Sequence, residues 1–184
     1  FTPEKSEGSV DVIFTFDASV VAPKTVVAFE TLTYKKIQIA VHADIEDKDQ
    51  TVYITTIRTS AKDNVTGINH TEADKEVTIT DTVTYKGLEV GREYTVSGTL
   101  MNQRTGAKIL VNGKPVTAST TFTAEKKEGS VEVVFAFDAS ALEGTTTVVY
   151  EKLYTENKEV AAHTDINDKG QTIYIPKVRT TAIA

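Results

Sequence analysis

The stretch SVEVVFAF, residues 130–137, alternates apolar side chains with others, as an extended chain does when one face is buried. The side chains that share one face are Val131, Val133, Phe135 and Phe137. Nearly the same stretch occurs earlier in the chain as SVDVIFTF, residues 9–16. The sequence therefore predicts a β-rich fold in which this strand is present twice.

The duplication extends well beyond the strand. FTPEKSEGSVDVIFTFDAS (1–19) aligns with FTAEKKEGSVEVVFAFDAS (122–140), and the match continues until IRTSA (57–61) aligns with VRTTA (178–182). About half of the aligned positions are identical. A repeat of this length is a whole domain and not a solenoid unit. The chain is thus one and a half copies of a domain in tandem.

The alignment predicts where the copies meet. Residues 1–56 are the C-terminal half of a preceding repeat, 57–176 form one complete domain, and 177–184 begin the next repeat. Half of a β-sandwich exposes its core and its strand edges. We therefore expect residues before Phe1, or another molecule, to complete the half repeat.

The remaining segments also indicate strands. In EYTVSGTL (93–100), one face carries Tyr94, Val96, Gly98 and Leu100. Turn residues separate the strands, and no segment has a convincing helical period. Short strands at this spacing favour an all-β, immunoglobulin-like antiparallel β-sandwich. Because Cys and Trp are absent, it is not a true antibody domain.

Composition narrows the class of protein. The net charge is -6 and the pI is about 5.1, which disfavours nucleic acid and anionic membranes as partners. No apolar run is long enough to span a bilayer, so we expect no membrane insertion here. With no cysteine, neither disulfides nor thiolate metal sites are available, and we expect no metal and no cofactor. An extracellular or cell-surface protein fits this acidic composition better.

Five polar side chains break the apolar pattern. In VTITDTVTY (77–85), the middle position of the inward face is an aspartate. The other polar residues are identified in the same way, because each shares a strand face with apolar residues two positions away. The five residues are Thr59, Asp81, Glu151, His163 and Gln171. Burying polar groups costs free energy unless they satisfy one another. We therefore expect the five to meet in the interior.

Taken singly, each of the five has an ordinary structural explanation. An inward Thr or Gln can bond to backbone, a carboxylate can be turned outward by a β-bulge, and a lone histidine is more often structural than catalytic. Three of them, however, recur in the front copy as Glu30, His42 and Gln50, and a threonine recurs as Thr180. A shared site explains this recurrence better.

Several motifs carry a resemblance to a known family. They are VAFETL (27–32), VVYEKL (148–153), ITDTVTYKGLEVGREYTVSGTLM (79–101), the block HxDxxDxxQT in HADIEDKDQT (42–51) and HTDINDKGQT (163–172), and an RT pair opening each unit. The chain resembles the VaFE repeats of Gram-positive surface proteins, also called T-Q ester bond domains. The resemblance implies an intramolecular ester between Thr59 and Gln171. It places Asp81, Glu151 and His163 around that bond.

The same resemblance assigns the remaining residues. Glu30, His42 and Gln50 form a partial site of the preceding repeat, and Thr180 is the cross-linking threonine of the next. In the complete site, neutral His163 takes the Thr59 proton as Thr59 attacks the Gln171 carboxamide and ammonia leaves. Two close carboxyls, Asp81 and Glu151, share a proton and offer it to the amide oxygen. The step runs once per molecule, so the protein is not an enzyme.

The function expected is a structural stalk domain of a cell-surface adhesin. Its partners are the adjacent repeats, and a host-cell ligand is bound through another domain. Three alternatives remain open: a ligand-binding adhesin module acting through loops 102–115, a pilin-like domain with a Lys to Asn or Asp isopeptide, and a hydrolase. The hydrolase would use His163, Glu151 and Asp81, but it is disfavoured because they face inward.

Overall fold

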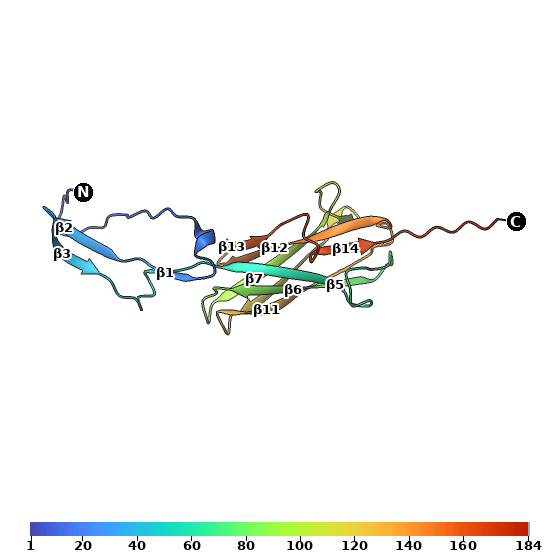
Figure 1. The fold of residues 1–184 in the computed structure, drawn as a ribbon, viewed down its shortest axis with the longest axis horizontal. Coiled ribbons are helices and arrows are strands. Elements are labelled where there is room, and N and C mark those ends of the chain that lie inside the picture. The colour runs from blue at the N-terminus through green and yellow to red at the C-terminus, as the bar shows by residue number, and fades with distance from the viewer. Residues whose placement is uncertain (184) are drawn as a thin grey trace.

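The structure is a computed structural model that describes residues 1–183. A closed β-sandwich and an open N-terminal part lie end to end, and the C-terminal residues extend beyond the sandwich (Figure 1). Among the described residues, the helical element is a single 3-10 turn, Ala18–Val20. No helix between residues 1 and 183 has the length and apolar character needed to cross a membrane.

Two antiparallel sheets make up the sandwich. One has the strand order β11-β6-β5, and the other has the order β10-β7-β12-β13, with β14 also paired to β12. The strands are β5 (Thr56–Asp63), β6 (Val77–Lys86), β7 (Glu93–Asn102), β10 (Thr117–Thr123), β11 (Glu128–Phe137), β12 (Thr145–Thr155), β13 (Lys158–His163) and β14 (Thr172–Ile175). A short hairpin, β8 (Leu110–Val111) with β9 (Lys114–Pro115), lies outside them. The predicted all-β, immunoglobulin-like antiparallel sandwich is confirmed.

The alternating pattern of the sequence appears as alternating burial. Along β6, every second residue from Val77 to Tyr85 is buried, and the middle one is Asp81. On the facing sheet, Val96, Leu100 and Leu153 are fully enclosed. Each such aliphatic side chain stabilises the fold by roughly 1.5–3 kcal/mol when it is buried. The core thus positions a carboxyl group in an otherwise apolar interior.

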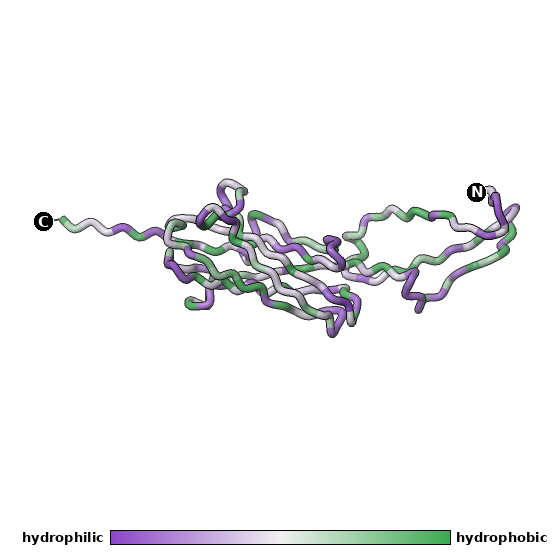
Figure 2. Tube along the Cα trace, turned by 180° about the vertical axis from the view of Figure 1, so that it is seen from behind, coloured by the Kyte–Doolittle hydropathy of each residue, from purple (hydrophilic) through white to green (hydrophobic). Residues whose placement is uncertain are grey.

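The N-terminal part forms only short strands: β1 (Thr25–Val27), β2 (Glu30–Tyr34), β3 (Ile37–His42) and β4 (Thr51–Tyr53). The strand predicted for residues 9–16 is absent, although the matching sequence forms β11. The physical reason is the missing partner, because β11 pairs along its whole length with β6, whereas no strand within residues 1–183 pairs with residues 9–16. The N-terminal part contains hydrophobic stretches of chain that lie apart from the sandwich (Figure 2). Phe14 is 57% exposed, whereas its counterpart Phe135 is 1% exposed.

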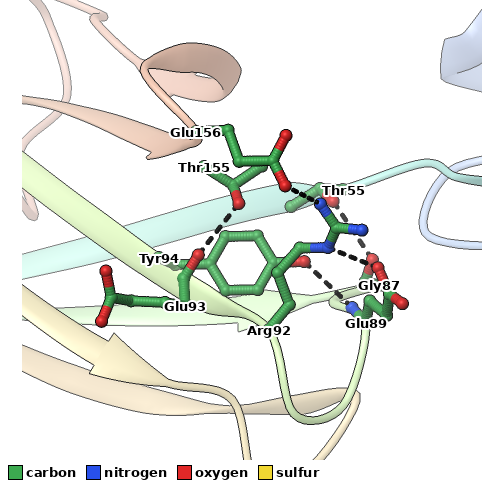
Figure 3. Close-up of polar contacts among 8 residues, drawn as sticks. All are labelled: Thr55, Gly87, Glu89, Arg92, Glu93, Tyr94, Thr155 and Glu156. Atoms are coloured by element: carbon green, nitrogen blue, oxygen red, sulfur yellow. Dashed lines mark hydrogen bonds and ion pairs between the residues drawn. The ribbon is translucent and has the colours of Figure 1, made fainter.

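The two parts join through a well-bonded linker. The Thr55 hydroxyl donates to the carbonyl of Gly87 at 3.1 Å (Figure 3). Gly87 has a φ of 79°, and a Cβ at this position would overlap the Ile54 carbonyl oxygen, so only glycine fits. Beside it, the Arg92 guanidinium bridges Glu89 and Glu156, the latter at 2.9 Å. The linker is therefore held against the end of the sandwich.

Candidate functional site

Two carboxyl groups face each other from the centres of the two sheets. Glu151 lies on β12, where it is flanked by Gly98 of β7 and by His163 of β13. Asp81 lies on β6, between β5 and β11. Both side chains are completely buried. Because each is on a central strand, neither can turn out to solvent without breaking its sheet.

The threonine and the glutamine come from opposite ends of the domain and are brought together at one edge. Thr59 is on β5, which lies against β13 and β14 of the other sheet. Gln171 directly precedes β14 and is fully buried. The Ala61 N–H donates to the Gly170 carbonyl at 2.9 Å, which ties β5 to the loop before β14. The Gln171 amide nitrogen in turn donates to Asp81 Oδ1 at 3.1 Å.

A set of unpaired oxygen atoms marks the site. Within residues 1–183, the buried side-chain nitrogen and oxygen atoms that lack a hydrogen-bond partner are Thr59 Oγ1, Asp81 Oδ2, both carboxyl oxygens of Glu151 and Gln171 Oε1. All belong to four of the five residues predicted from sequence. Unpaired buried polar groups are costly and are rare in folded proteins. These four residues therefore carry all the unsatisfied buried side-chain groups found between residues 1 and 183.

The electrostatics explain how two buried carboxyls coexist. Burial, and after it the hydrogen bond with Asp81 and the charge of Asp81, together raise the pKa of Glu151 to about 10. Burial also raises the pKa of Asp81, against hydrogen bonds from Glu151, Gln171 and the Ser60 N–H that favour its charged form. A proton on Glu151 supplies the donor that its oxygens otherwise lack. The pair therefore holds a proton at neutral pH.

The fifth residue, His163, is held by a carboxylate that the sequence analysis did not assign. Its Nε2 lies 2.7 Å from Asp168 Oδ2, and Asp168 also accepts the Gly170 N–H at 2.7 Å. Burial raises the pKa of Asp168, but the hydrogen bonds from Gly170 and His163 outweigh it and leave the pKa below its usual value. The signal was available, because this aspartate is part of the block that recurs around His42 as Asp47.

The orientation of the carboxamide adds a detail to the expected chemistry. In the expected chemistry the carboxyl pair offers its shared proton to the amide oxygen of Gln171, whereas in the structure the amide nitrogen faces Asp81. Half a turn about the last side-chain bond exchanges the two atoms. The carboxyl pair is thus placed to act on either end of the carboxamide.

The partial sites are assembled to different degrees. In the half repeat, Glu30 lies opposite His42, and His42 Nε2 contacts Asp47 at 2.9 Å. With its nitrogen turned toward Glu30, the Gln50 amide lies 3.2 and 3.3 Å from the two carboxyl oxygens. Thr180, in contrast, is exposed in a segment without regular structure. Among the described residues, no group of three or more His, Asp or Glu side chains is arranged to hold a metal ion.

Comparison with known proteins gives one family. The model of the T-Q ester bond containing domain matches residues 1–54 and again residues 55–175. A search of curated proteins finds no match to the chain.

Among solved structures, the sandwich is similar to a bacterial adhesin from Mobiluncus mulieris described as containing intramolecular disulfide, isopeptide and ester bond cross-links, in two crystal forms. One gives a TM-score of 0.56 at 20% identity, over 67% of this chain and 57% of the adhesin chain. The other gives 0.54 at 21% identity, over 65% and 56%. The match thus spans less than two thirds of the adhesin chain, and at this identity it shows a shared fold.

Proposed function

Since this chain belongs to the family of T-Q ester bond containing domains, we propose that Thr59 and Gln171 form an intramolecular ester and that the domain is a stalk segment of a bacterial surface adhesin. The single observation that supports the cross-link best is the set of unpaired buried oxygens on Thr59, Asp81, Glu151 and Gln171. Ester formation consumes both the unpaired hydroxyl of Thr59 and the carboxamide of Gln171. An extracellular location fits the adhesin named among the similar structures.

The reaction needs a base for the hydroxyl. Because Asp168 engages Nε2 of His163, the other ring nitrogen is left to accept the Thr59 proton. Thr59 Oγ1 then attacks the side-chain carbonyl carbon of Gln171, forming a C–O bond. The Asp81–Glu151 proton stabilises the charge that develops on the carboxamide. The C–N bond breaks, the proton taken from Thr59 is passed to the leaving nitrogen, and ammonia departs. The overall reaction converts a hydroxyl and a carboxamide into an ester and ammonia, and it consumes no other reactant.

The exclusion of water from the interior favours formation of the ester over its hydrolysis. Water at the same site would hydrolyse the ester, since the groups that activate the amide would also activate the product. Gln171, Asp81 and Glu151 are fully buried, which excludes bulk solvent. Each folded molecule therefore forms its ester once, and the released ammonia is lost to solvent.

The topology gives the cross-link a mechanical role. Thr59 is near the start of the domain on β5, and Gln171 is near its end before β14. A covalent bond between them carries tension past the hydrogen-bonded core from one neighbouring repeat to the next. This arrangement suits a stalk whose partners are adjacent repeats, with a host-cell ligand bound by another domain and the chain anchored to the cell wall outside this segment.

Intact mass spectrometry of the denatured protein tests the proposal. The wild type is expected to be lighter than the sum of its residues by one ammonia, and both Thr59→Ala and Gln171→Ala are expected at full mass. Peptide mapping should recover residues 59 and 171 in one linked species. A wild type at full mass would contradict the proposal. A Thr59→Ala protein that kept the deficit would point instead to an isopeptide between other residues.

A further inference from the structure

Gly98 occupies a position where a glycine is costly. It lies in the middle of β7, it is buried, and its backbone does not adopt the left-handed conformation that favours glycine. Glycine inside a strand weakens the strand, and often marks a place where another group approaches closely. In the register of the sheet, the residue directly opposite Gly98 is Glu151.

The space left by the missing side chain is already filled. A Cβ on Gly98 would overlap the tip of the Phe135 ring and would lie 2.7 and 2.9 Å from the two carboxyl oxygens of Glu151. Neither neighbour has an outward path, because Glu151 is fully buried and Phe135 is 1% exposed. The carboxyl of one sheet and the aromatic ring of the other therefore share the volume that any other residue would need.

We propose that Gly98 is a positioning residue for ester formation, whose bare backbone lets the Glu151 carboxyl lie flat against β7 while the Phe135 ring closes over it from the facing sheet. This inference rests on the proposed cross-link. A methyl group at position 98 would push the carboxyl away from Asp81 or lift the ring and admit water. Either displacement weakens the sharing of a proton between the two carboxyls, which the reaction requires.

The chain offers a matched control. Gly129, on β11, is also a strand glycine, and a Cβ there would lie 2.6 and 2.9 Å from the Oη and Cζ atoms of the Tyr85 side chain. The overlap is again with an aromatic side chain, here that of the paired strand β6, and the Tyr85 ring stacks on Phe122. Gly98→Ala and Gly129→Ala therefore both press a methyl group against an aromatic side chain, while only the first also meets the Glu151 carboxyl.

The first measurement is the rate of ammonia loss. Wild type, Gly98→Ala and Gly129→Ala are made by cell-free synthesis, quenched at intervals in denaturing acid and weighed intact. Gly98→Ala is expected to cross-link at least tenfold more slowly than wild type, and Gly129→Ala at nearly the wild-type rate. Equal rates for Gly98→Ala and wild type, or equal losses in both glycine variants, would overturn the proposal. A wild type without ammonia loss would instead refute the cross-link itself.

The second measurement separates positioning from general damage. In a Thr59→Ala background, which cannot react, the Glu151 carboxyl is titrated by carbon NMR. Adding Gly98→Ala should shift its titration to lower pH, because the carboxyl leaves its enclosed place between Asp81 and Phe135, and adding Gly129→Ala should not. An unshifted titration overturns the proposal. So does a Gly98→Ala protein that fails to fold, since Gly98 would then serve the fold and not the site.

Discussion

The complete domain and the half repeat contain the same glutamate, histidine, aspartate and glutamine at the same spacing. Both place the glutamate opposite the histidine across an antiparallel pair, and both join the histidine to the aspartate, at 2.7 Å in the domain and 2.9 Å in the half repeat. They differ in enclosure. The His163 side chain is 20% exposed and that of His42 is 51% exposed.

This difference separates the features that form from local sequence from those that need the second sheet. The hairpin that carries Glu and His, and the turn that carries Asp and Gln, form from their own sequence even without a second sheet. Enclosure comes from β5, β6 and β7, which supply Thr59, Asp81 and Gly98 and have no counterpart in residues 1–54. The half repeat thus has the polar groups of the site, but not the dry setting that raises the pKa of Glu151.

The largest effect is expected from removing the cross-link. Gln171→Ala leaves the chain unlinked, and a cross-link closing a loop on the order of 100 residues is worth roughly 5 kcal/mol when the entropy model for disulfides is applied. Gln171→Ala should therefore unfold at much lower denaturant concentration than wild type. The matched variant Gln50→Ala should keep the deficit of one ammonia, relative to the sum of its own residues, and the unfolding midpoint of wild type.

Chemical denaturation followed by circular dichroism measures this difference, with intact mass recorded on the same samples. A Gln50→Ala protein that lost stability or an ammonia deficit along with Gln171→Ala would erase the distinction between the two regions. It would mean that the half repeat also reacts, with a partner outside residues 1–54.

A pH-dependent effect of several kcal/mol is expected in the unlinked protein. In Thr59→Ala, folded Glu151 keeps its proton up to about pH 10, whereas an unfolded glutamate releases it near pH 4.3. Between these values the folded state binds one more proton, so each unit of rising pH lowers the free energy of unfolding by up to about 1.4 kcal/mol. Stability should therefore fall from about pH 6 to pH 9.

Replacing the titrating group tests the cause. Thr59→Ala/Glu151→Gln should lose this slope and be more stable than Thr59→Ala at the upper end of the range. Thr59→Ala/Glu30→Gln is the control from the half repeat and should retain the slope. Urea unfolding at a series of pH values gives both. A slope that survived Glu151→Gln would assign the pH dependence to other groups.

The sequence was sufficient for the parts of the site that depend on strand parity. Asp81, Glu151 and Gln171 stood out because each interrupts an apolar face, and the structure brings all three into the interior. It was not sufficient for residues 9–16, since a period of two records a preference for pairing but not whether a partner exists. Gly98 fell on an inward face, yet its spatial role depends on Phe135 of the other sheet, which no local pattern contains.

A moderate effect on rate is expected at Asp168. Asp168→Asn keeps the shape but loses the negative charge that holds His163, and a hydrogen bond to a charged group is worth roughly 1.5–3 kcal/mol. Ester formation should slow by about ten- to a hundredfold. Asp47→Asn makes the equivalent change beside His42 and should leave the rate alone. Time-resolved intact mass measures both, and an unchanged rate in Asp168→Asn would remove this residue from the mechanism.

The smallest effect is expected at the joint between the two regions. Arg92 bridges Glu89 and Glu156 next to the linker, but Arg92 is itself partly exposed and Glu156 is largely exposed (Figure 3). Exposed ion pairs contribute about 0–1 kcal/mol and are screened by salt. Arg92→Ala should therefore shift the unfolding midpoint slightly in low salt and not at all in high salt. A larger loss that persisted in high salt would show that Arg92 stabilises this end of the sandwich by more than two exposed ion pairs can.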